Sequence, residues 1–168
     1  MNPSTGSGRE PGTGRELLRH ALATVAYRGG KAMRGAPESF ATFRIGDASR
    51  PPVNLVAHIG DLLDWALLMA QGKTAWKDSE PLPWDQQVER FFATLKALDG
   101  YLASDEALHV SLEKLFQGPV ADALTHVGQL AMLRRVAGAP IRAENYAMAE
   151  IVVGRTGADQ TAARREFD

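Results

Sequence analysis

The chain has 168 residues, of which 45% are hydrophobic, with no cysteine and a formal net charge of -1 at pH 7. This length and composition fit one globular domain with a substantial core. The near-zero charge gives no electrostatic footprint for nucleic acid, and the absence of cysteine excludes disulfides, thiolate metal sites and cysteine nucleophiles. No segment has the expected apolar length of a membrane span, and we expect a cytoplasmic protein that binds neither nucleic acid nor membrane.

The N-terminal part predicts a polar lead followed by a helix. Residues 1–13 are rich in Gly, Ser and Pro and lack the apolar stretch of a signal peptide, so we expect a disordered lead. From residue 14 apolar side chains recur at helical spacing, which predicts a helix that ends near Gly29 and Gly30. Residues 31–52 contain Gly, Pro and Ser without a sustained period, which indicates a long irregular connection.

Two further helices are predicted in the middle of the chain. Pro51 and Pro52 suit a helix start, since the first turn has no internal partner for their missing amide hydrogens. This second helix is expected to run to about Gly72. The most regular amphipathic pattern of the chain, between Val88 and Leu102, predicts the third.

The fourth main helix is expected after a short capped one. Ser104, followed by two acidic residues, favours the start of a short helix that stops at Gly118. Pro119 then suits the start of a helix that continues through Val136.

The end of the chain predicts one more helical piece, over 144–153, and a mobile polar tail over 155–168. The sequence has no internal repeat and no convincing strand alternation. The expected fold class is therefore all-α, a four-helix bundle with short additional helices, formed by a domain over 14–154.

Three side chains with metal-ligating groups stand within apolar helical patterns. His58 lies in the predicted second helix, and Asp122 and His126 stand four residues apart in the fourth. That spacing places two side chains about 5–6 Å apart on one helix face. All three are expected to face the core, where a carboxylate needs a cation or strong donors to offset its desolvation. Two imidazoles and a carboxylate suit a catalytic divalent cation with open positions for water or substrate.

A structural interpretation stands beside this one. A lone inward histidine is commonly a hydrogen-bonded core residue, and Asp-x-x-x-His is commonly a surface hydrogen bond. The adjacent arginines of the fourth helix, Arg134 and Arg135, are expected at the solvated surface. If the site binds a metal, the expected pocket-lining residues are Asp61, Trp65 and Gln129, with His20 as a more distant candidate.

Three motifs, in their order and spacing, resemble those of one family. They are VAHI at 56–59, ADALTHVGQ at 121–129, and GAPI at 138–141 followed by ENY at 144–146. On these motifs the chain resembles the DinB/YfiT-like superfamily of helical-bundle proteins, described as metal-dependent hydrolases. The resemblance spans most of the chain.

The resemblance implies a specific topology and ligand set. The helices would run up, down, down and up with one long crossover, and the protein would form a homodimer. One histidine of the second helix and a His-x-x-x-His pair of the fourth would hold the metal, and these positions fall on His58, Asp122 and His126. Asp122 departs from the family pattern, which has histidine there. Asn145 and Tyr146 would line the mouth of the site.

The resemblance implies a divalent-metal-dependent enzyme in which metal-activated water, or a low-molecular-weight thiol cosubstrate, attacks a small-molecule substrate. It would be a hydrolase or a thiol S-transferase. Zinc or nickel is the expected metal, with iron and manganese as alternatives. Two other hypotheses stay open: a non-catalytic binding or structural protein on the same scaffold, and a non-haem iron oxygenase-type enzyme suggested by the two-histidine, one-carboxylate set.

Overall fold

Helices make up most of the structure, a computed structural model that describes residues 11–167. Its long helices are α1 (Pro11–Met33), α2 (Pro52–Ala70), α3 (Trp84–Ala103) and α5 (Ala121–Val136). The predicted all-α class is thus confirmed at the level of a mostly helical chain. A disordered lead was predicted over residues 1–13. Residues 1–10 lie outside the described part of the chain, and α1 already begins at Pro11.

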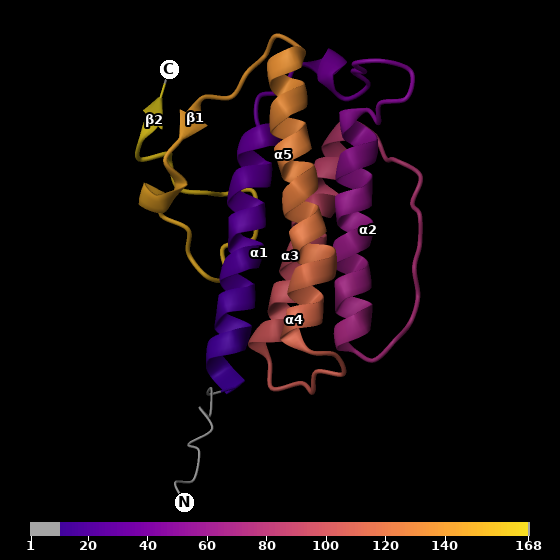
Figure 1. The fold of residues 1–168 in the computed structure, drawn as a ribbon, viewed down its shortest axis with the longest axis vertical. Helices are drawn as coiled ribbons and strands as arrows, with labels where there is room; N and C mark the ends of the chain where they lie inside the picture. Colours follow the sequence, from indigo (N-terminus) through magenta and orange to yellow (C-terminus); the bar gives the residue numbers. More distant parts are fainter. Residues whose placement is uncertain (1–10, 168) are drawn as a thin grey trace, which may run out of the picture.

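The long helices stand side by side. α1 and α5 run in one direction, whereas α2 and α3 run in the other (Figure 1). α2 packs against α3 and α5, and α1 packs against the same two helices. The connection over 71–83 returns along the outside of α2 to the start of α3 (Figure 1). The core between the helices is apolar and includes the fully buried Leu22, Ile59, Phe91 and Leu130.

The first helix continues through the two glycines that were expected to end it. A Cβ atom on Gly29 would lie 2.6 Å from Cζ of Phe91, and one on Gly30 would lie 3.3 Å from Cζ of Phe92. The glycines therefore allow the aromatic rings of α3 to pack directly on α1. Burial of an aromatic side chain outweighs the cost of about 1 kcal/mol for a glycine within a helix, so the predicted end at these glycines is wrong.

The short helix predicted from Ser104 is also wrong. Ser104 ends α3, and its hydroxyl donates a hydrogen bond to the carbonyl oxygen of Tyr101. The next helix is α4 (Leu112–Leu115), whose N-cap Ser111 accepts a hydrogen bond from the backbone N–H of Lys114 through its hydroxyl.

No stop separates α4 from α5. A π-helical turn, η2 (Phe116–Val120), joins them and contains Pro119. Proline lacks the N–H that an α-helix would use, and a local π turn is one way in which a chain accommodates such a break in the hydrogen-bond ladder. The predicted stop at Gly118 is therefore wrong, and α5 starts without a separate cap.

The helix predicted over 144–153 is absent. The chain instead forms β1 (Ala143–Glu144) and the 3-10 turn η3 (Tyr146–Met148), and β1 pairs antiparallel with β2 (Glu166–Phe167). The expected mobile tail thus ends in a strand, and its Thr156 is 3% exposed.

Ionic contacts with α1 explain this C-terminal structure. Glu144 is buried, and its carboxylate accepts hydrogen bonds from the Tyr27 hydroxyl and the Lys31 ammonium, both at 2.6 Å. Lys31 also donates to Glu166 at 2.7 Å. These charge-assisted bonds favour the antiparallel pairing of β1 with β2 over the local helical preference.

Arg134 is buried, although it was expected at the surface, whereas Arg135 is exposed. The Arg134 guanidinium donates to the carbonyl oxygens of Ala32 and Arg34 at the end of α1, and to that of Ala139. These carbonyls lack helical partners, and a cation at a helix C-terminus is favoured by the helix dipole.

By length and composition, α2 is apolar enough to cross a membrane, contrary to the expectation from the sequence. However, 56% of its most apolar window is buried inside the fold, as in the core helix of a globular protein.

Candidate metal centre

The three predicted ligands come together where α2 packs against α5. α5 buries Ala123, Val127 and Leu130 at the spacing of one helix face. Asp122 and His126 each precede one of these residues, so they lie along the edge of the buried stripe. His58 has the same position on α2, beside the buried Ala57 and Ile59.

The ligand atoms converge without bonding to one another. Nε2 of His126 lies 3.4 Å from Oδ1 of Asp122, and Nε2 of His58 lies 3.8 Å from Oδ2. One nitrogen or oxygen from each residue lies within 4.8 Å of the other two. Both nitrogen–oxygen distances exceed the usual hydrogen-bond range of about 2.7–3.2 Å. Bond lengths of about 2.0–2.2 Å to one cation place two ligand atoms roughly 3.0–3.6 Å apart. The His126–Asp122 distance falls in this range and the His58–Asp122 distance is slightly longer, so the cluster could hold a metal ion.

Asp122 is less buried than predicted. Its side chain is 46% exposed, compared with 21% for His58 and 13% for His126. The carboxylate therefore lies partly in solvent, and the expectation that it faces the core is wrong. Residues 122 and 126 both lie beside the apolar stripe, and solvent reaches the cluster on the side of Asp122. A cation there would keep positions open toward solvent.

The surroundings of the two imidazoles favour metal binding. Burial, followed by the positive charges of His126 and Arg50, lowers the pKa of His58, so its neutral form, which has a free lone pair, is favoured. Nδ1 of His126 lies 3.0 Å from Oε1 of Gln129. If Nδ1 carries the proton in this bond, Nε2 is free to bind a cation, the arrangement usual for metal-ligating histidines.

Two tryptophans form a wall on one side of His58. The Trp76 ring packs edge-on against His58 at 5.8 Å between centroids, and Trp65 packs against Trp76 at 5.7 Å. Trp76 comes from the connection between α2 and α3. Trp65 therefore contributes to the site through its contact with Trp76. Helical periodicity could not place Trp76, because this residue lies in a loop.

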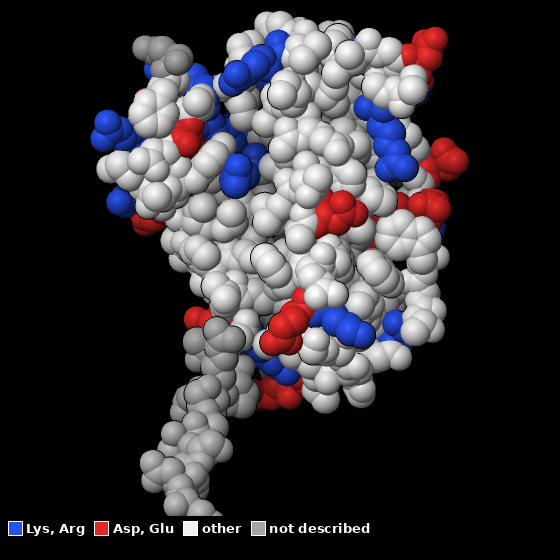
Figure 2. Space-filling view, viewed as in Figure 1, with Lys and Arg blue, Asp and Glu red and all other residues white. Residues whose placement is uncertain are grey.

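A groove of about 460 Å³ opens on the other side of the cluster. His126 and Gln129 line it, together with apolar side chains of α2 and α5, and Arg50 and Ser49 line it from the connection before α2. Charged side chains on the visible face are scattered and of both signs (Figure 2). Helical periodicity did not predict that Arg50 and Ser49 line the groove, because both lie in the irregular connection before α2. The one feature of the sequence that could have pointed to Arg50 is its place immediately before the Pro-Pro helix start.

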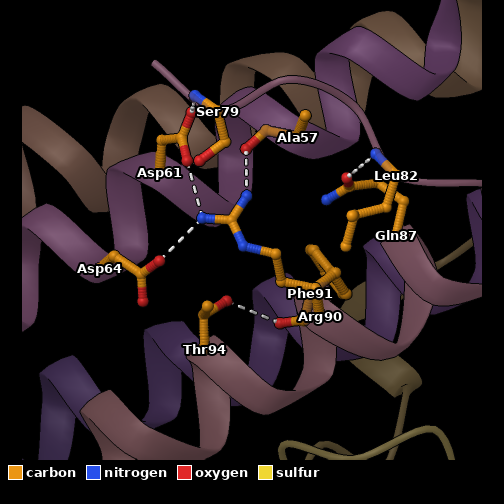
Figure 3. A network of polar contacts seen from close by, with 9 residues as sticks. All are labelled: Ala57, Asp61, Asp64, Ser79, Leu82, Gln87, Arg90, Phe91 and Thr94. Atoms are coloured by element: carbon orange, nitrogen blue, oxygen red, sulfur yellow. Dashed lines mark hydrogen bonds and ion pairs between the residues drawn. The ribbon is translucent and has the colours of Figure 1, made fainter. Parts of the chain in front are cut away.

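Asp61 does not line the site. Its Oδ1 accepts a hydrogen bond from Arg90 at 2.7 Å and its Oδ2 accepts one from the backbone N–H of Ser79 at 2.9 Å (Figure 3). Arg90 also donates to Asp64 and to the carbonyl oxygen of Ala57. Asp61 thus belongs to a structural network between α2 and α3, and it does not line the groove beside His126.

Three other predicted lining residues lie elsewhere. Tyr146 packs edge-on against Tyr27 of α1, and the Asn145 side chain caps η3 by accepting a hydrogen bond from the N–H of Ala147. This C-terminal segment lies beside α1, away from α2 (Figure 1). His20 is exposed on α1. The structure brings none of the three to the cluster.

Comparisons with known proteins gave no match: no protein-family model matches this chain, and no curated protein or solved structure is significantly similar to it. The likeness to the DinB/YfiT-like superfamily therefore rests on the short motifs of the sequence. The function rests on the geometry of the site.

Proposed function

We propose that the protein is a metal-dependent enzyme of the DinB/YfiT-like kind, in which His58, Asp122 and His126 hold one divalent cation. The observation that carries this proposal is the convergence of two imidazole nitrogens and a carboxylate at distances of 3.4 and 3.8 Å. These distances are long for hydrogen bonds and close to those between two ligands of one cation.

The donor atoms of these three residues fit a divalent cation, and the neighbouring side chains would have distinct roles around it. The cation would supply Lewis acidity and lower the pKa of a bound water or thiol, in a hydrolase or a thiol S-transferase acting on a small molecule. Gln129 would hold His126 in the ligating tautomer, and Trp76 would shield His58 from water. The solvated side of Asp122 would leave room for substrate. The donor set suits zinc or nickel, with iron and manganese as alternatives.

The directions of the helices support the family proposal. α1 and α5 run opposite to α2 and α3, and a long connection separates the two parallel helices α2 and α3 (Figure 1). This is the order that an up-down-down-up four-helix bundle with one crossover requires. The proposed homodimer follows from the resemblance, and light scattering that returns the monomer mass across micromolar concentrations would contradict it.

Metal content tests the proposal directly. Protein purified without a histidine tag is expected to hold close to one divalent ion per chain by elemental analysis, as isolated or after reconstitution. Asp122→Ala and His58→Ala should lose it. His20→Ala is the matched control, because His20 is exposed on a helix that does not carry the cluster, and it should keep its metal.

The outcomes separate the alternatives. Equal metal content in all four proteins would reject the site. A wild-type protein that takes up no metal would support a non-catalytic binding protein on this scaffold. The two-histidine, one-carboxylate set also fits a non-haem iron oxygenase, and oxygen consumption after anaerobic loading with iron would favour that enzyme over zinc-type chemistry.

A further inference from the structure

An arginine without a partner lies beside the proposed metal site. No side-chain hydrogen bond or ion pair engages Arg50 among the residues that the structure describes. Arg50 is exposed and lines the groove that His126 and Gln129 also line. Arg90, Arg134 and Arg19, by contrast, all donate to carboxylates or carbonyl oxygens. The groove therefore holds an arginine fork whose donors are open to a ligand.

The loop that carries Arg50 is held in place by its own hydrogen bonds. The Ser49 hydroxyl accepts from the backbone N–H groups of Ile45 and Gly46, at 3.0 and 3.3 Å, and donates to the Gly46 carbonyl at 2.7 Å. Arg44 donates to the carbonyl oxygen of Ser49. On the other side the buried Pro51 begins the entry into α2. The backbone that carries Arg50 is thus held in place, and its exposed side chain can turn toward a ligand in the groove.

Charge counting indicates an anionic ligand. Two neutral imidazoles, one carboxylate and a divalent cation sum to +1, and Arg50 raises the local charge to +2. A single carboxylate ligand would offset half of this charge. A guanidinium also matches a carboxylate geometrically, through two parallel hydrogen bonds.

The rest of the groove is apolar. Ile45, Leu55, Met132 and Leu133 line it, and Ile45 and Met132 are 61% and 59% exposed. Its volume of about 460 Å³ lies within the range of small-molecule sites, roughly 300–1,000 Å³. Exposed apolar side chains beside a free cation are the chemistry that recognises an amphipathic acid.

We propose that this groove binds a small organic acid as the substrate of the site, with its carboxylate on Arg50 and its apolar body along Ile45, Leu55, Met132 and Leu133. The end of the molecule beside His126 would face the metal. This assignment of a substrate class rests on the proposed function.

Calorimetric titration of zinc-loaded and metal-free protein tests the proposal. The probes are 4-phenylbutyrate, its neutral amide, acetate and phenyl phosphate. We expect 4-phenylbutyrate to bind at least about tenfold more tightly than the amide or acetate, and Arg50→Gln to weaken it about tenfold or more, as for loss of one charge-assisted pair. Arg135→Gln, which removes an exposed arginine of α5 outside the groove, should bind like the wild type.

Equal affinity for acid and amide, or an unchanged affinity in Arg50→Gln, would overturn the proposal. Tighter binding of phenyl phosphate than of 4-phenylbutyrate would overturn the choice of a carboxylate. Metal analysis of the same samples separates the two hypotheses. Metal uptake without acid binding rejects the groove alone, whereas Arg50-dependent acid binding by a protein that takes up no metal supports the groove and rejects the metal centre.

Discussion

Two polar clusters lie within one turn of each other on α2, and they differ in how their carboxylates are used. In the first, both oxygens of Asp61 accept hydrogen bonds, at 2.7 and 2.9 Å, and the side chain is 3% exposed. In the second, Asp122 faces His58 and His126 at 3.8 and 3.4 Å and is about half exposed. The first cluster is complete without a ligand. In the second, the three side chains face one another without forming hydrogen bonds between them.

This difference separates a structural network from a candidate site. A buried carboxylate whose two oxygens both accept hydrogen bonds from the protein stabilises one packing arrangement, and its burial keeps it from a ligand. Convergent groups that do not satisfy one another remain available for a ligand. The two clusters therefore predict opposite consequences for matched substitutions, one in folding and the other in binding.

The largest expected effect is loss of metal from the second cluster without loss of stability. His126→Ala should lower metal affinity by at least about a hundredfold, since it removes one of three ligands. The unfolding free energy of the metal-free protein should change by less than about 1 kcal/mol, because the one hydrogen bond of this ring, to Gln129, lies at the exposed surface. Metal titration and chemical denaturation of metal-free protein measure the two quantities, and a large loss of stability would erase the contrast.

Asp61→Ala should have the reverse consequence. Breaking the pair leaves Arg90 and the Ser79 N–H with fewer partners, and we expect a cost of about 2–4 kcal/mol in unfolding free energy. This range is below that of a fully buried pair, because the Arg90 side chain is 20% exposed. Asp64→Ala is the control, since that side chain is 49% exposed and should cost about 0.5 kcal/mol. Metal binding should persist in both variants when measured below the denaturation midpoint.

Gln129 sharpens the comparison within the metal centre. Gln129→Ala removes the partner of Nδ1 of His126, and loss of such a supporting bond typically lowers metal affinity by about 10–100-fold. Gln129→Glu keeps an acceptor at this position and should retain most of the affinity. If both variants bind metal equally weakly, the hydrogen bond does not orient His126.

The smallest effect is expected in a third cluster, in which Lys31 of α1 pairs with Glu144 and Glu166. Lys31 lowers the pKa of Glu166 by hydrogen bonding and then by charge, so the ionised carboxylate is favoured in the folded chain. Its contribution is therefore present above the unfolded-state pKa and is lost as pH falls through the folded-state value. The protection factors of the β2 amides, which correct for the slower intrinsic exchange in acid, should fall on acidification below about pH 4.5, and Glu166→Gln should show the lower protection already at neutral pH. Wild-type protection factors that do not respond to pH would indicate that the strand is held by other contacts.

The sequence by itself determined the helical class, the course of α2, α3 and α5, and the candidate metal cluster of His58, Asp122 and His126. Helical periodicity is a local property, and it places a residue on a face within a few turns. It failed where packing outweighs local preference, as at Gly29, where Phe91 of α3 packs directly on α1.

Only the tertiary structure decided which polar residues already have partners. Asp61 and His58 look alike in the sequence, three residues apart on one helix, but Asp61 meets Arg90 across 29 residues of chain. Lys31 donates a hydrogen bond to Glu166 across 135 residues. This contact favours a pair of antiparallel strands where a helix and a mobile tail were predicted. Only the fold shows that Arg50 lines a groove together with His126. Such partners are brought together by packing, and no spacing within one helix encodes them.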